Sequence, residues 1–204
     1  MEITSPNNQR QSDSQRYAPF VLLAGAQTLK KMCSALAAPA LGVMFTRGNM
    51  EVCCKILSSK DSHMYRDLRL ESLKLYPESF GSSYEEQSQL PKLFFEKFIE
   101  EQCETHVMIG AFENGQLVGL CGLIPTDSGD SLEVVQMYVS ASARGKSVGQ
   151  QLLSKACSIL SSRLEGKLEL TVYVNNDAAI ASYEKFGFKQ VSKTDQEIVM
   201  NFEP

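Results

Sequence analysis

The chain has 204 residues, of which 43% are hydrophobic and 22% charged, as in an ordinary globular protein with room for one full core. Its net charge of −4 and the lack of a Lys/Arg cluster argue against nucleic acid as a partner. No run of apolar residues is long enough to predict a transmembrane helix, so we expect no membrane association.

The first residues differ from the rest of the chain. Residues 1–16 are polar, which is typical of disorder, whereas residues 17–45 are rich in alanine and leucine, and no Asp or Glu occurs from Ser14 to Met50. This pattern fits a loosely packed leader helix, sequence upstream of a start at Met50, or an organelle transit segment. A secretory signal does not fit, because Lys30 and Lys31 interrupt the apolar stretch. We therefore expect an extension over residues 1–48 and a domain over residues 49–204 of a cytoplasmic protein, with organelle targeting as the alternative.

The first half of this domain predicts two helical regions between strands. Residues 51–57 are typical of a short strand, and residues 62–76 of a helix that Pro77 ends. Residues 82–101 predict a second helical region, interrupted by Pro91. A hairpin follows over residues 106–112 and 116–125, because Asn114-Gly115 accepts the positive φ of a tight turn.

The second half alternates strands and helices. Strands are expected over residues 132–139, 167–174 and 197–202. Between them lie a helix with an apolar stripe that extends to Leu164 and stops at Gly166, and a short helix over residues 176–188. This order predicts an α/β fold, with one twisted sheet covered by helices on both faces.

The turn at residues 144–149, Arg-Gly-Lys-Ser-Val-Gly, carries the strongest chemical signal. It joins an apolar strand to a helix, so several backbone N–H groups and the positive end of the helix dipole point to one place. That place suits a phosphate. Arg144 and Lys146 add positive charge to a region, residues 51–204, that holds fifteen basic and twenty-two acidic side chains. A plain loop between strand and helix is the alternative.

Together with the next helix, this turn resembles the GNAT superfamily of acetyl-CoA-dependent N-acetyltransferases. Members carry Arg/Gln-x-x-Gly-x-Gly/Ala after a strand, and Asn-x-x-Ala-x-x-x-Tyr-x-x-x-Gly-Phe about thirty residues later. The matching residues are Arg144, Gly149, Asn176, Ala179, Tyr183, Gly187 and Phe188. Ser147 stands where the family has its middle glycine, which puts its Cβ at a cost if the backbone there has a positive φ.

The resemblance implies a mixed, mostly antiparallel sheet, acetyl-CoA as the acetyl donor, and no metal. The turn would hold the pyrophosphate, the preceding strand would line the pantetheine arm with a backbone N–H near Met137 at the oxyanion, and Asn176 would bond the arm or cap its helix. The expected cofactor-binding residues are Met137, Tyr138, Val139, Arg144, Gly145, Lys146, Ser147, Val148, Gly149 and Asn176.

Two residues are expected to carry protons. Tyr183 is the candidate general acid, because a phenol with a pKa of about 10 stays protonated at neutral pH and can donate to a thiolate; a packing tyrosine is the alternative. Glu133 is the candidate base for the amine, with a solvent-facing strand residue as the alternative.

The sequence thus predicts an N-acetyltransferase that acts on a primary amine of a small molecule or a protein, or, as the alternative, a non-catalytic acyl-CoA-binding module with the same fold. The acceptor is not readable from these residues. Family members are often dimers, so a homodimer is possible.

Overall fold

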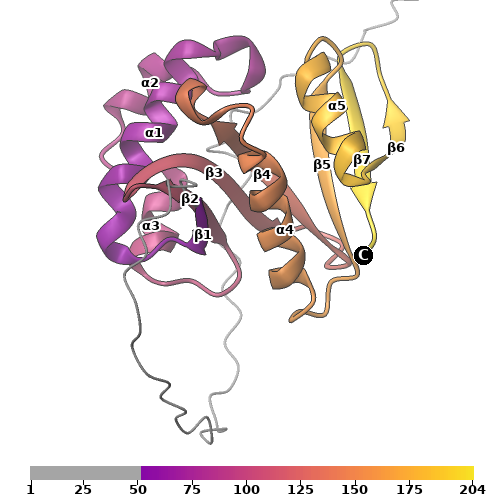
Figure 1. Cartoon of the computed structure of the whole chain (residues 1–204), viewed down its shortest axis with the longest axis horizontal. Coiled ribbons are helices and arrows are strands. Elements are labelled where there is room, and N and C mark those ends of the chain that lie inside the picture. Colours follow the sequence, from indigo (N-terminus) through magenta and orange to yellow (C-terminus); the bar gives the residue numbers. More distant parts are fainter. Residues whose placement is uncertain (1–51) are drawn as a thin grey trace, which may run out of the picture. The chain divides into compact units, whose positions relative to one another are not determined.

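In the computed structural model, residues 52–204 are described, and they form one open sheet of seven strands with helices on both faces (Figure 1). The extension expected over residues 1–48, and with it the boundary expected at residues 48 and 49, lies outside this part. No helix within residues 52–204 is long and apolar enough to cross a membrane.

The sheet has the order β1-β2-β3-β4-β5-β7-β6. All neighbouring strands run antiparallel except β4 and β5, which are parallel. The mixed, mostly antiparallel sheet expected from the sequence is therefore confirmed. The strands are β1 (Cys53–Ile56), β2 (Val107–Glu113), β3 (Gln116–Pro125), β4 (Ser131–Val139), β5 (Lys167–Tyr173), β6 (Lys189–Lys193) and β7 (Glu197–Phe202).

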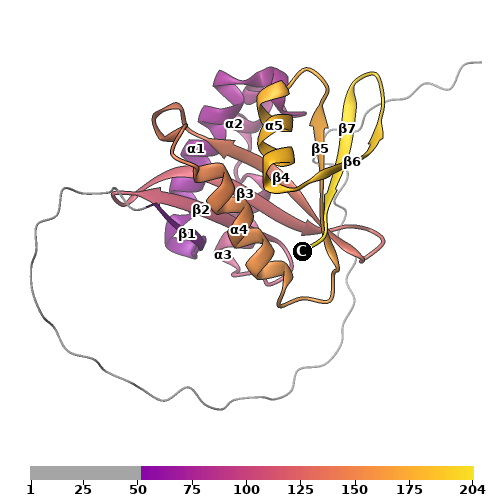
Figure 2. The same cartoon turned by 45° about the vertical axis from the view of Figure 1, so that its right-hand side comes forward.

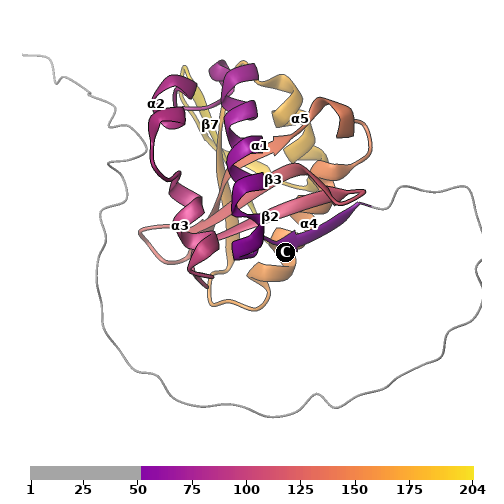
Figure 3. The same cartoon turned by 90° about the vertical axis from the view of Figure 1, so that its left-hand side faces the viewer.

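The helices form a layer on each side of the sheet (Figure 3). One layer holds α1 (Ser62–Leu75), α2 (Tyr84–Gln89) and α3 (Phe94–Glu100), and the other holds α4 (Val148–Leu160) and α5 (Asp177–Phe186). Each layer has its own core. Tyr65, Leu68 and Phe95 pack on the first face of the sheet, and Leu152, Ala156 and Leu160 of the α4 stripe pack on the second.

Local sequence signals explain several element boundaries. Asn114 and Gly115 have φ values of 53° and 80°, as the turn of the β2–β3 hairpin requires. Asn176 caps α5 by accepting a hydrogen bond from the N–H of Ala179 at 3.2 Å, and Gly187 ends that helix with a φ of 118°.

One expectation about elements was wrong, and one strand was not predicted. The helix after the turn ends at Leu160, so Leu164 lies beyond its stripe and is fully exposed. Strand β6 was missed, because all five of its residues are exposed and it carries no apolar alternation that would indicate a strand.

Candidate active site

The candidate site lies where β4 and β5 separate. The two strands pair only over their first residues, from Ser131 opposite Lys167 to Glu133 opposite Glu169. Beyond that point β4 stays paired with β3, and β5 stays paired with β7 (Figure 2). The second half of β4 therefore presents one backbone edge to a gap in the sheet, where a ligand can take the place of a strand.

A cleft of about 790 Å³ occupies this gap. Its walls are the open end of β4, the turn before α4, helix α5 and the segment after α1. The sequence-predicted residues that line the cleft are Met137, Tyr138, Val139, Arg144, Gly145, Ser147, Val148, Gly149, Asn176 and Tyr183. Folding thus brings together two motifs that lie about thirty residues apart in the chain.

The turn presents backbone to the cleft. Gly145 and Ser147 both have left-handed backbones, with φ values of 75° and 60°, and α4 begins directly after Ser147. A Cβ on Gly149 would lie 3.6 Å from Met137 Cε, in van der Waals contact, so glycine there leaves the floor of the cleft open. Unpaired N–H groups at a helix start, together with the helix dipole, fit a diphosphate in chemistry and in charge.

The two basic residues of the turn have different surroundings. The guanidinium of Arg144 lies 4.6 Å from the ring centroid of Tyr76 at the cleft, and its Nε donates to the carbonyl of Val139 at 3.1 Å. Lys146 does not line the cleft, because its Nζ forms an ion pair with Glu113 Oε1 at 2.6 Å. Of the two cations, only Arg144 therefore lies at the cleft, and the Lys146 side chain is engaged by Glu113.

Tyr183 lines the cleft and also packs in the core. Its side chain is 9% exposed and packs against Phe188, with the ring centroids 5.7 Å apart. Burial, and to a smaller extent the nearby Cys121, raises the pKa of this phenol above its ordinary value. The hydroxyl therefore stays protonated over the physiological range, as a proton donor must.

Glu133 lies apart from the cleft lining. It occupies the last position at which β4 and β5 are paired, about 13 Å along the strand from Met137. Its cross-strand partner Ile124 belongs to the core under α1 and α3, so Glu133 is on the face of the sheet opposite α5 and Tyr183. Glu133 is not among the residues that line the cleft.

Several cleft residues were missed by sequence reasoning. Tyr76 and Phe80 come from the segment after α1, and their rings cover one side of the cleft. Gln150 on α4 donates to the backbone carbonyl of Ser182 on α5 at 2.9 Å, and Lys185 lies one turn further along α5. Tyr76 and Phe80 lie 68 and 64 residues before Arg144, and the segment after α1 carries no motif, so the sequence held no signal for its position.

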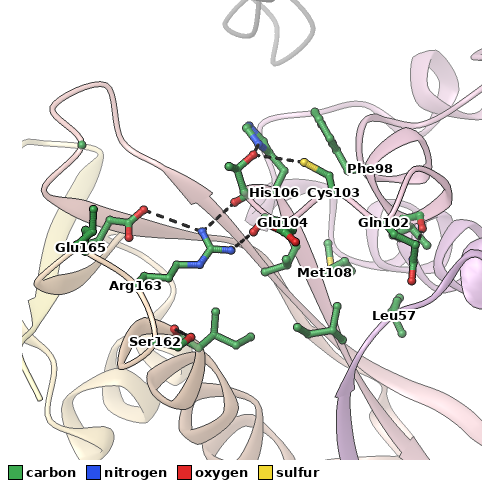
Figure 4. A pocket seen from close by; sticks show the side chains of 17 residues that line it. Leu57, Phe98, Gln102, Cys103, Glu104, His106, Met108, Ser162, Arg163 and Glu165 are labelled. Carbon is green, nitrogen blue, oxygen red and sulfur yellow. Dashed lines mark hydrogen bonds and ion pairs between the residues drawn. The ribbon is translucent and has the colours of Figure 1, made fainter. Parts of the chain in front are cut away.

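A second cavity, of about 680 Å³, lies at the other end of α4 (Figure 4). Arg163 forms part of its wall, but the guanidinium already donates to the backbone carbonyls of Glu104 and Thr105. The carboxyl end of α4 also contributes the negative end of a helix dipole here. The cleft at the start of α4 is thus the better site for an anionic ligand.

Comparisons with known proteins agree with this geometry. The sequence model of the acetyltransferase (GNAT) family matches residues 66–188. A Bacillus subtilis (strain 168) protein, named as a ribosomal protein bS18-alanine N-acetyltransferase, is 26% identical over 128 residues, which cover 61% of this chain and 79% of that protein.

Solved structures share the fold. A GNAT family acetyltransferase from Streptococcus pneumoniae superposes with a TM-score of 0.64 at 19% identity, over 75% of this chain and 99% of that one. PaiA N-acetyltransferase from Thermoplasma acidophilum, solved in complex with coenzyme A, gives a TM-score of 0.57 at 21% identity, over 76% of this chain and all of that one.

Proposed function

The chain belongs to the acetyltransferase (GNAT) family, and we propose that it moves the acetyl group of acetyl-CoA to a primary amine by direct attack in a ternary complex. The observation that carries the proposal is the cleft, which has anion-binding backbone at one end and a buried phenol in the same lining. Residues 49–204 would form the catalytic domain.

Cofactor binding would use the backbone of the turn and the open edge of β4. The N–H groups of residues 145–149 would hold the pyrophosphate, and Arg144 would add charge at the rim. Met137, Tyr138 and Val139 would pair with the pantetheine arm, and Asn176 would bond it from the start of α5. The structural neighbour solved with coenzyme A supports this placement through its shared fold.

The reaction forms a C–N bond and breaks the C–S bond of the thioester. A backbone N–H at the open end of β4, near Met137, would stabilise negative charge as it develops on the carbonyl oxygen. Tyr183 would give its proton to the departing thiolate and recover one from solvent. The amine proton would pass through water to Glu133, which lies on the opposite face of the sheet from Tyr183. The two proton carriers would thus work from opposite sides of the gap.

The acceptor would be a small-molecule amine or a protein amine. The Bacillus subtilis relative, named for an alanine of a ribosomal protein, supports a protein amine. The net charge of −4 also favours approach of a cationic acceptor.

Free-thiol release from acetyl-CoA, measured with a panel of amines and amine-bearing peptides, tests the proposal. We expect Tyr183→Phe to lower kcat by about 10²- to 10⁴-fold while calorimetry finds unchanged coenzyme A binding. Tyr173→Phe is the matched control, because Tyr173 is a half-buried phenol on β5 that does not line the cleft. Coenzyme A binding without thiol release from any acceptor would instead identify a non-catalytic binding module.

The role of Glu133 has its own test. In Glu133→Gln, the amine must lose its proton to solvent, so kcat/KM should fall about 10²-fold at pH 7 and recover as the pH approaches the amine pKa of about 10. Glu169→Gln changes the carboxylate paired with Glu133 across the strands, and it serves as the comparison. Equal pH profiles for the two variants would assign the effect to charge and remove Glu133 as the base.

A further inference from the structure

Strand β4 contains a strained residue at the point where the gap opens. Opposite the two steps from Leu120 to Gly122 on β3, β4 takes three steps, from Val135 to Tyr138. This extra residue is a β-bulge, and Gln136 within it has a φ of 51°. The other non-glycine residues with positive φ in the described part of the chain lie in turns, whereas Gln136 lies inside a strand.

Helix α1 contacts this bulge from the face of the sheet opposite α4 and α5. The phenol of Tyr65 donates to Gln136 Oε1 at 2.9 Å, and the Tyr65 side chain is completely buried, with Phe95 packed edge-on against its ring. This packing restrains the ring and with it the position of the hydroxyl. The bond to its amide acceptor therefore fixes the side chain of Gln136.

A second bond from the same helix lies beyond the bulge. The hydroxyl of Tyr138 donates to Glu71 Oε1 at 2.9 Å. Tyr65 and Glu71 on α1 thus grip β4 at residues 136 and 138, on both sides of Met137. The segment they hold is the first part of the β4 edge that lines the cleft.

We propose that Tyr65 and Gln136 are positioning residues for acetyl transfer, which together hold the open edge of β4 where its N–H groups can meet the reacting carbonyl. The inference rests on the proposed function. A left-handed conformation costs a non-glycine residue about as much as one buried hydrogen bond contributes. The Tyr65 bond can therefore offset a cost of the same size as the strain at Gln136. Neither residue lines the cleft, so neither is expected to touch the cofactor.

Tyr65→Phe removes the hydroxyl and keeps the ring. We expect kcat to fall about tenfold or more, because small misplacement of positioned groups has large effects on rate. Coenzyme A affinity should fall by a smaller factor than kcat, since the turn that binds the diphosphate is untouched and only the β4 edge that would pair with the pantetheine arm is held less firmly. Gln136→Leu removes the acceptor of this hydrogen bond from a half-buried position, and it should lower kcat as Tyr65→Phe does. Ser72→Ala is the control, because Ser72 is a buried α1 hydroxyl that bonds only its own helix, at Arg69 O.

Rescue separates positioning from packing. Glycine adopts positive φ without strain, so Tyr65→Phe combined with Gln136→Gly should recover part of the lost kcat. A kcat for Tyr65→Phe equal to that of Ser72→Ala, or equal losses of kcat and coenzyme A affinity, would overturn the proposal.

Hydrogen exchange at the amides of residues 137–139 provides a readout without turnover. It should become faster in Tyr65→Phe and stay unchanged in Ser72→Ala. If the wild-type chain had no transferase activity but the variants still showed this difference, the proposed function would be contradicted. The role of Tyr65 and Gln136 in holding the β4 edge would not be. Unchanged exchange in Tyr65→Phe would contradict the proposal that Tyr65 holds the β4 edge.

Discussion

At the scale of single residues, Ser147 introduces backbone strain into the proposed anion-binding turn. Its backbone is left-handed, with φ of 60° and ψ of 20°, at the position where the family pattern has glycine. The sequence raised this possibility, and the structure shows the positive φ. A side chain there costs about 1 kcal/mol or more relative to an unstrained backbone. Ser147 is also one of the residues that line the cleft.

We expect Ser147→Gly to tighten coenzyme A binding and to raise the free energy of unfolding by up to about 1 kcal/mol, the gain being limited by the greater freedom of glycine in the unfolded chain. Calorimetry and urea unfolding measure the two effects. Gly145→Ser is the reciprocal control. A Cβ at Gly145 has no atom within 4 Å, so this variant reports the cost of positive φ alone and should lose stability. Weaker binding in Ser147→Gly would show that the serine hydroxyl contributes to the site.

At the scale of elements, the β4–α4 turn divides its two cations between binding and structure. Arg144→Met should weaken coenzyme A binding about tenfold, as for the loss of one charge-assisted hydrogen bond, and should reduce the salt dependence of the Kd. Lys146→Met should leave the Kd within about twofold. It should instead cost about 1 kcal/mol of stability, because Glu113, whose side chain is 10% exposed, loses its ion-pair partner. Calorimetry at two salt concentrations checks the first variant, and urea unfolding the second. Equal losses of affinity in both variants would contradict this division.

Elements with a complete local signal could be predicted from the sequence. Helix α5 has its cap at Asn176, its stop at Gly187 and an apolar anchor at Phe188, and each of these signals depends only on near neighbours. Strand β6 has no such signal, because it pairs with β7 at the exposed edge of the sheet and buries no side chain. Its existence depends on a tertiary partner that local patterns do not reveal.

The same distinction applies to the candidate site. The positions of the turn, Asn176 and Tyr183 could be predicted, because two motifs with fixed spacing contain them. The position of Tyr76 could not, since it depends on how α1 crosses the sheet, and neither could the Lys146–Glu113 pair, which joins residues thirty-three positions apart. The bulge at Gln136 is also a tertiary feature, because nothing in an apolar strand sequence indicates a positive φ.

At the scale of the whole molecule, a buried carboxylate network stabilises the domain between β1 and α1. Asp61 lies between these elements with a side chain that is 4% exposed. Its Oδ2 accepts hydrogen bonds from the N–H and the hydroxyl of Ser58, at 2.9 and 2.7 Å, and from Lys55 Nζ at 3.0 Å. Burial alone would raise the pKa of this carboxyl, but the bonds from Ser58 and Lys55 outweigh it and lower the pKa from 3.8 to about 2.

A folded-state pKa below the unfolded value means that the charged carboxylate stabilises the fold above pH 4, and that this contribution is lost as the pH falls toward 2. The shift corresponds to about 2 kcal/mol. Asp61→Asn should therefore lower the free energy of unfolding by about that amount at pH 7, and by progressively less below pH 4. Urea unfolding of both proteins between pH 7 and pH 3 measures the difference. Asp130→Asn provides the contrast: hydrogen bonds from Ser128, Lys167 and Ser131 also lower the Asp130 pKa to about 2, but this carboxyl is exposed, so its effect should be smaller and should weaken with added salt. A difference between wild type and Asp61→Asn that is as large at pH 3 as at pH 7 would show that Asp61 acts through the shape of its side chain and not through its charge.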